Sequence, residues 1–202
     1  DNIHHVTDSV YQLFLQHNYT GENIYYLATE DRDLDNDGFN DVDASPSNRT
    51  LELAITQWAR DKVSSEQALT LYLMDHGGVN ELFLNGYNQF ITPNDVDGWL
   101  DTLEAEAPGV RVNVVVEACH AGSFIGAPQS LSQPGRVVMA STGIYNLAYP
   151  SESGAFFSDA LVAALGRGAS LYGAFSEAQS AANQAHPDQT PWLDDDGDGV
   201  PN

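Results

Sequence analysis

Two continuous apolar runs, each ending in a short polar segment with glycine, constrain the fold of this chain most strongly. Residues 68–74 (ALTLYLM) lead into DHGG, and residues 111–118 (RVNVVVEA) lead into CHAG. Runs of this kind are typical of strands buried on both faces of a parallel sheet. Because the carboxyl ends of parallel strands meet at the edge where α/β proteins hold their active sites, the two polar segments are expected to lie together.

The rest of the chain alternates between strand and helix patterns. Buried strands are also predicted over residues 23–29 and 136–142, and Asn85-Gly86 predicts a hairpin within residues 81–91. Helical spacing predicts helices over residues 6–17, with Thr7 or Asp8 as cap, over residues 50–63, from residue 92 onward, and over residues 153–165 and 170–185. We therefore expect one α/β domain over residues 1–202, with a mostly parallel sheet and helices on both faces.

The charge balance excludes several partner classes. The chain carries 29 acidic and 7 basic residues, for a net charge of −22. Nucleic acids and anionic membrane surfaces both require clustered lysine and arginine, so neither is expected as a partner. No apolar run is long enough to span a membrane. The chain has 1 cysteine, which excludes an internal disulfide.

The two strand ends offer a catalytic pair. Neighbouring strands lie roughly 4.7–4.9 Å apart, so His76 could deprotonate Cys119 for nucleophilic attack. The N–H groups of Gly77 and Cys119 are predicted to bind the resulting oxyanion. A core thiol beside an unrelated loop histidine is the alternative interpretation. Metal chelation by His76, Cys119 and His120 would lack a fourth ligand at a recognisable spacing.

The segments LYLMDHGG and VVVEACHAGSF also carry a resemblance. They resemble the His-Gly and Glu-Ala-Cys-x-x-Gly-Ser motifs of the legumain family, within the caspase-like group; gingipains and clostripain are more distant relatives. The resemblance implies a three-layer caspase-like fold and a cysteine endopeptidase that acts on polypeptides through a thioester acyl-enzyme. It implies no cofactor for catalysis.

The start of the chain resembles the same family, in which a first strand ends in Asn-x-Arg-His before a helix. The match is Asn2-Ile3-His4-His5. By this resemblance Asn2 orients the catalytic histidine, and His4 stands where the family has a pocket arginine. The first strand is then expected upstream of Asp1. A zymogen is implied, with its removed N-terminal segment as a further partner.

The resemblance also implies a substrate pocket. Glu117 matches the family acid two residues before the nucleophile, and Ser141 and Thr142 resemble the edge that pairs with an extended peptide. An ion pair at a strand end, or plain strand-end hydroxyls, are the alternatives. A second pocket acid has no clear match near residues 154–157. An acidic pocket without arginine favours a basic or polar residue before the scissile bond.

Two acidic loops predict structural calcium. One has acids at Asp33, Asp35, Asp37 and Asp41, with Gly38 at the sixth position and the Phe39 carbonyl at the seventh, as in calcium-binding loops. Ala44 replaces the glutamate expected at position twelve. The acidic tail, residues 194–202, offers Asp194, Asp196 and Asp198 and is either a second site or the start of a linker. Two such loops favour a secreted, extracellular protein.

Two other functions remain open at this stage. The same cleft in a catalytically silent, calcium-stabilised domain would hold peptides without cleaving them. A transpeptidase would use the same Cys-His pair and resolve the thioester with an amine instead of water. The intact combination of His76, Cys119 and their glycines favours an active enzyme over the silent domain.

Overall fold

The main sheet confirms the predicted parallel arrangement. A computed structural model describes residues 2–86, 89–126 and 128–202. Within them, a four-stranded sheet has the order β1-β5-β6-β7, with β1 parallel to β5, β5 parallel to β6, and β7 antiparallel at the far edge. The strands are β1 (Leu69–Met74), β5 (Val112–Glu117), β6 (Arg136–Ala140) and β7 (Trp192–Asp194).

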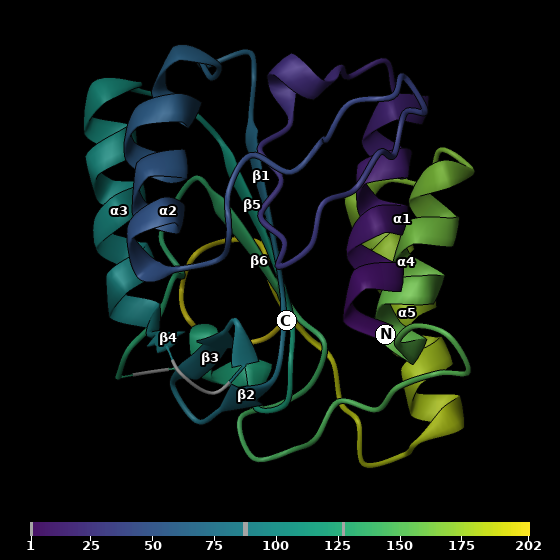
Figure 1. Cartoon of the computed structure of the whole chain (residues 1–202). Helices are drawn as coiled ribbons and strands as arrows, with labels where there is room; N and C mark the ends of the chain where they lie inside the picture. Colours follow the sequence, from purple (N-terminus) through teal and green to yellow (C-terminus); the bar gives the residue numbers. More distant parts are fainter. Residues whose placement is uncertain (1, 87–88, 127) are drawn as a thin grey trace.

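Helices cover both faces of this sheet (Figure 1). On one side lie α2 (Asn48–Leu53), which continues into the π-helix η2 (Ala54–Trp58) and the 3-10 turn η3 (Ala59–Asp61), and α3 (Pro93–Glu106). On the other lie α1 (Asn2–Gln16), α4 (Phe156–Gly166) and α5 (Leu171–Ala185). Short 3-10 turns are η1 (Gly21–Asn23) and η5 (Ala121–Phe124). Among the described residues, no helix combines the length and the apolar character needed to cross a membrane.

Alternation along the strands builds a separate core on each face. Val112, Val114 and Val116 of β5 pack with residues of α2, η2 and α3, while Val115 packs toward α4 and α5. These valines are 0–5% exposed, as expected for a strand covered on both sides. The strand β5, which ends two residues before Cys119, is therefore packed against helices on both faces.

Two local devices fix α3 against the sheet. Thr92 caps the helix, accepting from Asp95 N while the Asp95 side chain accepts from Thr92 N, and Pro93 opens the first turn. At its other face, the fully buried Arg136 guanidinium contacts three carboxylates of α3, each at 2.7 Å: Asp97, Asp101 and Glu104.

A small second sheet follows β1 directly. It contains β2 (Gly77–Gly78), β3 (Glu81–Leu84) and β4 (Gln89–Ile91), paired antiparallel in that order. The hairpin predicted at Asn85-Gly86 is confirmed, although residues 87–88 lie outside the described part. Because β2 starts one residue after His76, this sheet fixes the backbone on the carboxyl side of the histidine.

Three predictions about elements were wrong. Residues 23–29 do not join a sheet: apart from η1 at their start, they make only an isolated bridge, Leu27 to Ala44. The first helix begins at Asn2 rather than near Val6, so Thr7 and Asp8 lie inside it and cap nothing. The strand β7 was missed, because three residues are too few to show periodicity.

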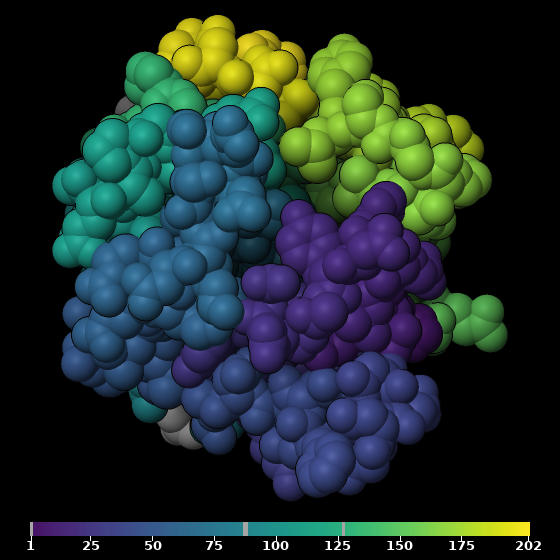
Figure 2. Space-filling view, turned by 90° about the horizontal axis from the view of Figure 1, so that it is seen from above, coloured from purple at the N-terminus to yellow at the C-terminus, as the bar shows by residue number. Residues whose placement is uncertain are grey.

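The space-filling view places the two acidic loops on opposite sides of the molecule (Figure 2). The loop around residues 31–46 forms a lobe at the lower edge, and the yellow C-terminal residues lie at the upper edge. Between the purple N-terminal residues and the blue residues that follow the acidic loop, the surface is recessed.

Candidate active site

The register of the two central strands places His76 and Cys119 level with each other. Met74 pairs with Glu117 at the last position of the parallel ladder. His76 and Cys119 each follow two residues later, so both leave the sheet at the same edge. Their alignment follows from the pairing of β1 with β5 and needs no other element.

Direct contact between backbones draws these two strand ends together. A Cβ atom added to Gly77 would lie 2.3 Å from the Cys119 carbonyl oxygen and 2.9 Å from the Ala118 Cβ. No side chain fits in that space, so only glycine allows the segment after His76 to lie against Cys119. The glycine that follows the predicted base therefore allows the strand end with His76 to contact the strand end with Cys119.

The His76 side chain is exposed, and its backbone is held on both sides. Its N–H donates to the Asp75 carboxylate at 2.7 Å, and its carbonyl accepts from Phe83 N at 2.9 Å. Burial raises the pKa of Asp75, and the His76 N–H bond opposes that shift. The imidazole thus projects from an anchored backbone toward solvent at the sheet edge.

Cys119 is half-buried, and its thiol lies next to a loop that sequence reasoning missed. The sulfur donates to the Ala148 carbonyl at 3.7 Å. In the same loop, before Ala148, Tyr145 (83% exposed) and Leu147 (47% exposed) present apolar surface to solvent.

Glycine contacts again explain how this loop reaches the cysteine. A Cβ on Gly122 would lie 2.8 Å from both Gly143 C and Ile144 N, so η5 packs directly against the loop backbone. The sequence contains Gly122 shortly after the predicted nucleophile, but it gives no indication that Gly122 contacts Gly143 and Ile144.

His120 completes the connection to this loop. Its N–H donates to Asn146 O, and its ring Nδ1 donates to Ile144 O, both at 2.9 Å. Its φ of 62° lies in the left-handed region, which is strained for a residue with a side chain and is common at functional sites. The ring of His120 therefore holds the loop at residues 144–146 against the turn that follows Cys119.

The predicted oxyanion donors, Gly77 and Cys119, belong to two backbone segments that contact each other. Among the described residues, the Cys119 N–H has no hydrogen-bond partner. The bond from Phe83 N to His76 O puts Gly77 at a non-hydrogen-bonded position of the β2–β3 ladder, so its N–H points away from β3.

Glu117 lies below the site, 3% exposed. Its Oε2 accepts from the Ser158 hydroxyl at 2.5 Å, and Ser158 is in turn 2.5 Å from the Tyr72 hydroxyl. Burial raises the pKa of Glu117 to about 7, against the opposing hydrogen bonds from Ser158 and Ser141. The carboxyl group thus forms part of a buried polar cluster between β5, β1 and α4.

A second acid that sequence reasoning missed lies near Glu117. The charge of Asp159 contributes to the raised pKa of Glu117, and the Asp159 carboxylate accepts from the Ser151 hydroxyl at 2.5 Å. A Cβ on Gly154 would lie 2.1 Å from Asp159 Oδ1, so this carboxylate fills the space beside the glycine. Asp159 lies two residues beyond the segment 154–157, in the first turn of α4.

Ser141 and Thr142 are both fully buried and offer no exposed edge. The Ser141 hydroxyl accepts from Ala118 N at 3.2 Å, which ties β6 to the residue before the cysteine. The Thr142 hydroxyl has no hydrogen-bond partner within the described residues. The Ser141 carbonyl already accepts from the Gln189 side chain at 3.0 Å.

Asn2 and His4 lie in the first turn of α1 instead of preceding it. The Asn2 amide donates to Gly154 O at 2.8 Å and to Ser151 O at 3.3 Å. Arg32 NH2 lies 2.6 Å from His4 Nδ1, and His4 Nε2 lies 3.2 Å from the Thr29 hydroxyl. Since a guanidinium only donates, His4 Nδ1 accepts, and Arg32 supplies a cation next to the residue expected to replace the family arginine.

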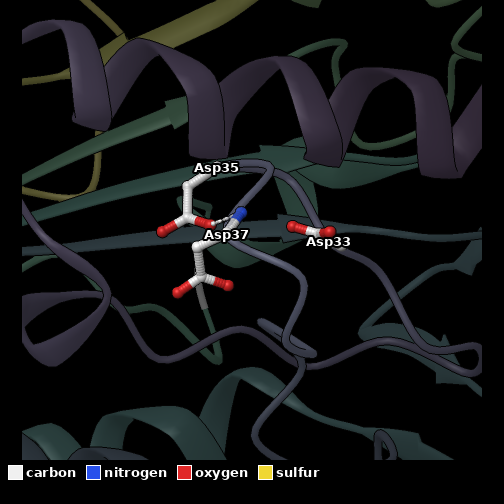
Figure 3. A group of neighbouring side chains, drawn as sticks. All are labelled: Asp33, Asp35 and Asp37. Atoms are coloured by element: carbon white, nitrogen blue, oxygen red, sulfur yellow. Dashed lines mark hydrogen bonds between the residues drawn. The ribbon is translucent and has the colours of Figure 1, made fainter.

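The first acidic loop gathers its carboxylates as a cation site requires (Figure 3). Ligand oxygens of Asp33, Asp35 and Asp37 lie within 4.8 Å of one another. Backbone N–H groups hold them: Gly38 N donates to Asp33, Asp37 N to Asp35, and Phe39 N to Asp37. The predicted Asp41 is not in this group, because Tyr11 and Leu34 N already donate to its carboxylate.

The second acidic loop repeats this geometry. Asp194, Asp196 and Asp198 form the other cluster among the described residues. Gly199 N donates to Asp194, Asp198 N to Asp196, and Val200 N to Asp198, in the same spacing as in the first loop. Positive φ angles also recur at the fourth and sixth positions: 62° and 90° at Asn36 and Gly38, 79° and 77° at Gly197 and Gly199.

Burial distinguishes the second loop from the first. Asp194 is fully buried at the end of β7; burial opposes its ionisation, but the N–H bonds from Gly197 and Gly199 lower its pKa. Oxygen donors of this type suit calcium, and the residues of both loops fit it.

Comparisons with known proteins support the fold alone. No protein-family model matches the chain, and neither does any curated protein. Among solved structures, caspase-1 from Spodoptera frugiperda resembles it with a TM-score of 0.57, over 76% of this chain and 69% of that chain, at 15% sequence identity. The chain therefore has a caspase-like fold, as expected, whereas this resemblance does not single out the legumain family.

Proposed function

We propose that this chain is a cysteine endopeptidase with Cys119 as nucleophile and His76 as general base. The observation that carries the proposal is the contact of Gly77 with the Cys119 carbonyl, which joins the strand end bearing the histidine to the one bearing the thiol. A caspase-like fold and a half-buried thiol beside an exposed imidazole at one sheet edge support the same chemistry.

The reaction would follow from these groups. His76 removes the thiol proton, and the Cys119 sulfur attacks the carbonyl carbon of the scissile peptide bond. The N–H groups of Gly77 and Cys119 stabilise the oxyanion. The C–N bond then breaks, and the departing amine takes the proton from His76. Water attacks the thioester, the C–S bond breaks, and the thiol is regenerated.

The acidic pocket suggests the residue before the scissile bond. Glu117 lies two residues before the nucleophile and has the Asp159 carboxyl near it, while the cation of Arg32 is held at His4 and by Asp8 and Glu30. We propose a basic or polar residue at this position of the substrate. Cleavage would require the Ala148 carbonyl to give up its contact with the thiol.

Covalent labelling tests the nucleophile directly. A peptidyl acyloxymethyl ketone with lysine next to its reactive group should add to Cys119, as located by mass spectrometry of the digested protein. The Cys119→Ala variant should take up no label. A wild-type protein that fails to react with such probes, with lysine, arginine or asparagine at that position, would instead support a silent peptide-binding domain.

We further propose that both acidic loops bind structural calcium, with Asp33, Asp35, Asp37 and the Phe39 carbonyl in the first and Asp194, Asp196 and Asp198 in the second. The repeated hydrogen-bond pattern of the two loops supports this. Sites of this kind are filled where calcium is abundant, so we propose an extracellular location.

Removal of calcium should destabilise the fold. At a calcium concentration about 100 times Kd, each site stabilises by about 2.7 kcal/mol, so a chelator that empties both sites should lower Tm by roughly 10–20 °C. In Asp35→Asn or Asp196→Asn the chelator should have a smaller effect, whereas the exposed Asp61→Asn control should behave as wild type. An unchanged Tm on chelation would contradict the calcium proposal.

A further inference from the structure

The hairpin that follows His76 and the turn that follows Cys119 contact each other. The hairpin consists of β2 and β3, at the carboxyl end of β1 (Figure 1), and residues 79–80 form its turn. The other segment is the 3-10 turn η5, which begins two residues after Cys119. Each segment follows one of the two proposed catalytic side chains. A bond between the two segments therefore acts on both halves of the site.

Ser123 in η5 makes such a bond. Its side chain is 1% exposed, and its hydroxyl oxygen accepts from Asn80 N at 2.9 Å. The same hydroxyl donates to His120 O at 2.8 Å. A hydroxyl has one proton to donate and lone pairs to accept with, so a single side chain bonds the hairpin turn and the nucleophile turn at once. An alanine in this place would make neither bond.

Both partners of Ser123 have a left-handed backbone. The φ angle is 61° at Asn80 and 62° at His120. Such angles are uncommon for residues with a side chain and persist where the surroundings hold them. The Ser123 hydroxyl takes up the N–H of Asn80, and it shares the His120 carbonyl with Ser123 N, which donates at 2.9 Å. Ser123 thus holds two uncommon turns in fixed positions.

The His120 turn extends this connection to the loop beside the thiol. His120 N donates to Asn146 O, and the same loop contains Ala148, whose carbonyl contacts the Cys119 sulfur. Three segments therefore meet around the nucleophile, and Ser123 bonds directly to two of them. Because the Ser123 hydroxyl is engaged with backbone groups, we expect it to act on the site through position and not through chemistry.

We propose that Ser123 is a positioning residue whose buried hydroxyl fixes the separation of the His76 imidazole from the Cys119 thiol. This inference rests on the proposed function, because it concerns the pairing of those two groups. The contact of Gly77 with the Cys119 carbonyl limits how closely the two strand ends can approach, and the Ser123 bond limits how far they can separate. Proton transfer requires hydrogen-bond reach, so loss of this restraint should slow the reaction itself.

Alkylation of the thiol tests the proposal without peptide turnover. The probe is iodoacetamide, which is small and neutral, and the chain has 1 cysteine for it to label. An imidazole within reach should let the wild-type protein keep at about pH 7 much of its rate at about pH 9, whereas His76→Ala should not. In Ser123→Ala we expect the ratio of the two rates to fall about tenfold, toward that of His76→Ala.

Peptide kinetics give a second measurement. In Ser123→Ala, kcat should fall roughly 10–100-fold while KM stays within about twofold, because a misplaced group slows the chemical step without removing a substrate contact. The matched control is Ser47→Ala, which removes the hydroxyl that caps α2. Loss of the cap should lower Tm but leave kcat and the alkylation profile as in wild type.

A second variant breaks the same bond from the other side and covers the case in which Ser123→Ala does not fold. One glycine inserted between Val79 and Asn80 lengthens a turn whose Val79 is exposed, a type of place that tolerates insertions. The insertion moves Asn80 N away from Ser123 and should cause the same loss of alkylation at neutral pH.

The alkylation profiles distinguish two ways to fail. If His76→Ala and wild type have the same profile, no imidazole–thiol pair exists, and the proposed function fails together with this inference. If those two profiles differ but Ser123→Ala and the glycine insertion both keep the wild-type profile, with only Tm lowered, Ser123 is merely structural. That second result overturns this inference and leaves the proposed function intact.

Discussion

Peptide turnover is expected to fall at least ~10³-fold in Cys119→Ala and roughly 10²–10⁴-fold in His76→Ala. The first variant loses the only sulfur nucleophile of the chain, and the second loses the group placed to deprotonate it. Initial rates on fluorogenic peptides, varied at the residue before the cut, measure both effects and also rank basic against asparagine-containing substrates.

The pH profile separates the two roles. Without His76, no neighbouring base takes the thiol proton, so residual turnover of His76→Ala should recover in part at alkaline pH, where hydroxide removes that proton. No such recovery is expected for Cys119→Ala. The matched control is His5→Ala, since His5 is an exposed histidine on α1. Turnover that survives in Cys119→Ala would remove the nucleophile from the mechanism.

The second large effect concerns stability. Glu117→Gln should stabilise the protein by about 3 kcal/mol above pH 7 and by almost nothing below pH 4.5. Burial raises the pKa of Glu117 from 4.5 to about 7. Below pH 4.5 the Glu117 carboxyl is protonated in both the folded and the unfolded protein, so it does not reduce the free energy of unfolding. As pH rises through about 7 the buried group must ionise, and the free energy of unfolding of the wild-type protein falls. Glutamine stays neutral throughout and avoids this loss.

Thermal unfolding at pH 4 and pH 8 measures the difference. At pH 8 the variant should melt about 6–12 °C higher than wild type, and at pH 4 the two should coincide. Glu22→Gln changes an exposed glutamate on η1 and should show no such pH-dependent difference. An equal shift at both pH values would mean that packing, rather than ionisation, distinguishes the two side chains.

The central strands could be predicted because their side chains record burial on both faces. The valines of β5 are buried on both sides, and the run that gives β1 ends where the strand ends. Residues 23–29 are also apolar but make only one isolated bridge, Leu27 to Ala44, because an apolar side-chain pattern reports burial and does not identify a partner strand. The buried Arg136 was missed for a related reason: its three carboxylates lie on a helix far away in sequence.

The site was predictable only where it follows from strand ends. His76, Cys119 and Glu117 lie at positions fixed by the β1–β5 register. The loop carrying Ala148 shows no periodicity, and the contact of Gly122 with Gly143 that places it joins distant residues. Asp159 was missed because its nearness to Glu117 depends on how α4 begins beside the sheet.

The absence of a side chain at Gly77 has a consequence for how this protein can vary. The His76 side chain is exposed and the Cys119 side chain is half-buried, so neither is enclosed on all sides. At Gly77, the Cys119 carbonyl oxygen lies only 2.3 Å from the position that a Cβ atom would occupy. A single methyl group there would push the two strand ends apart. Substitution at this edge is therefore constrained at Gly77, which has no side chain and takes no chemical part in a reaction.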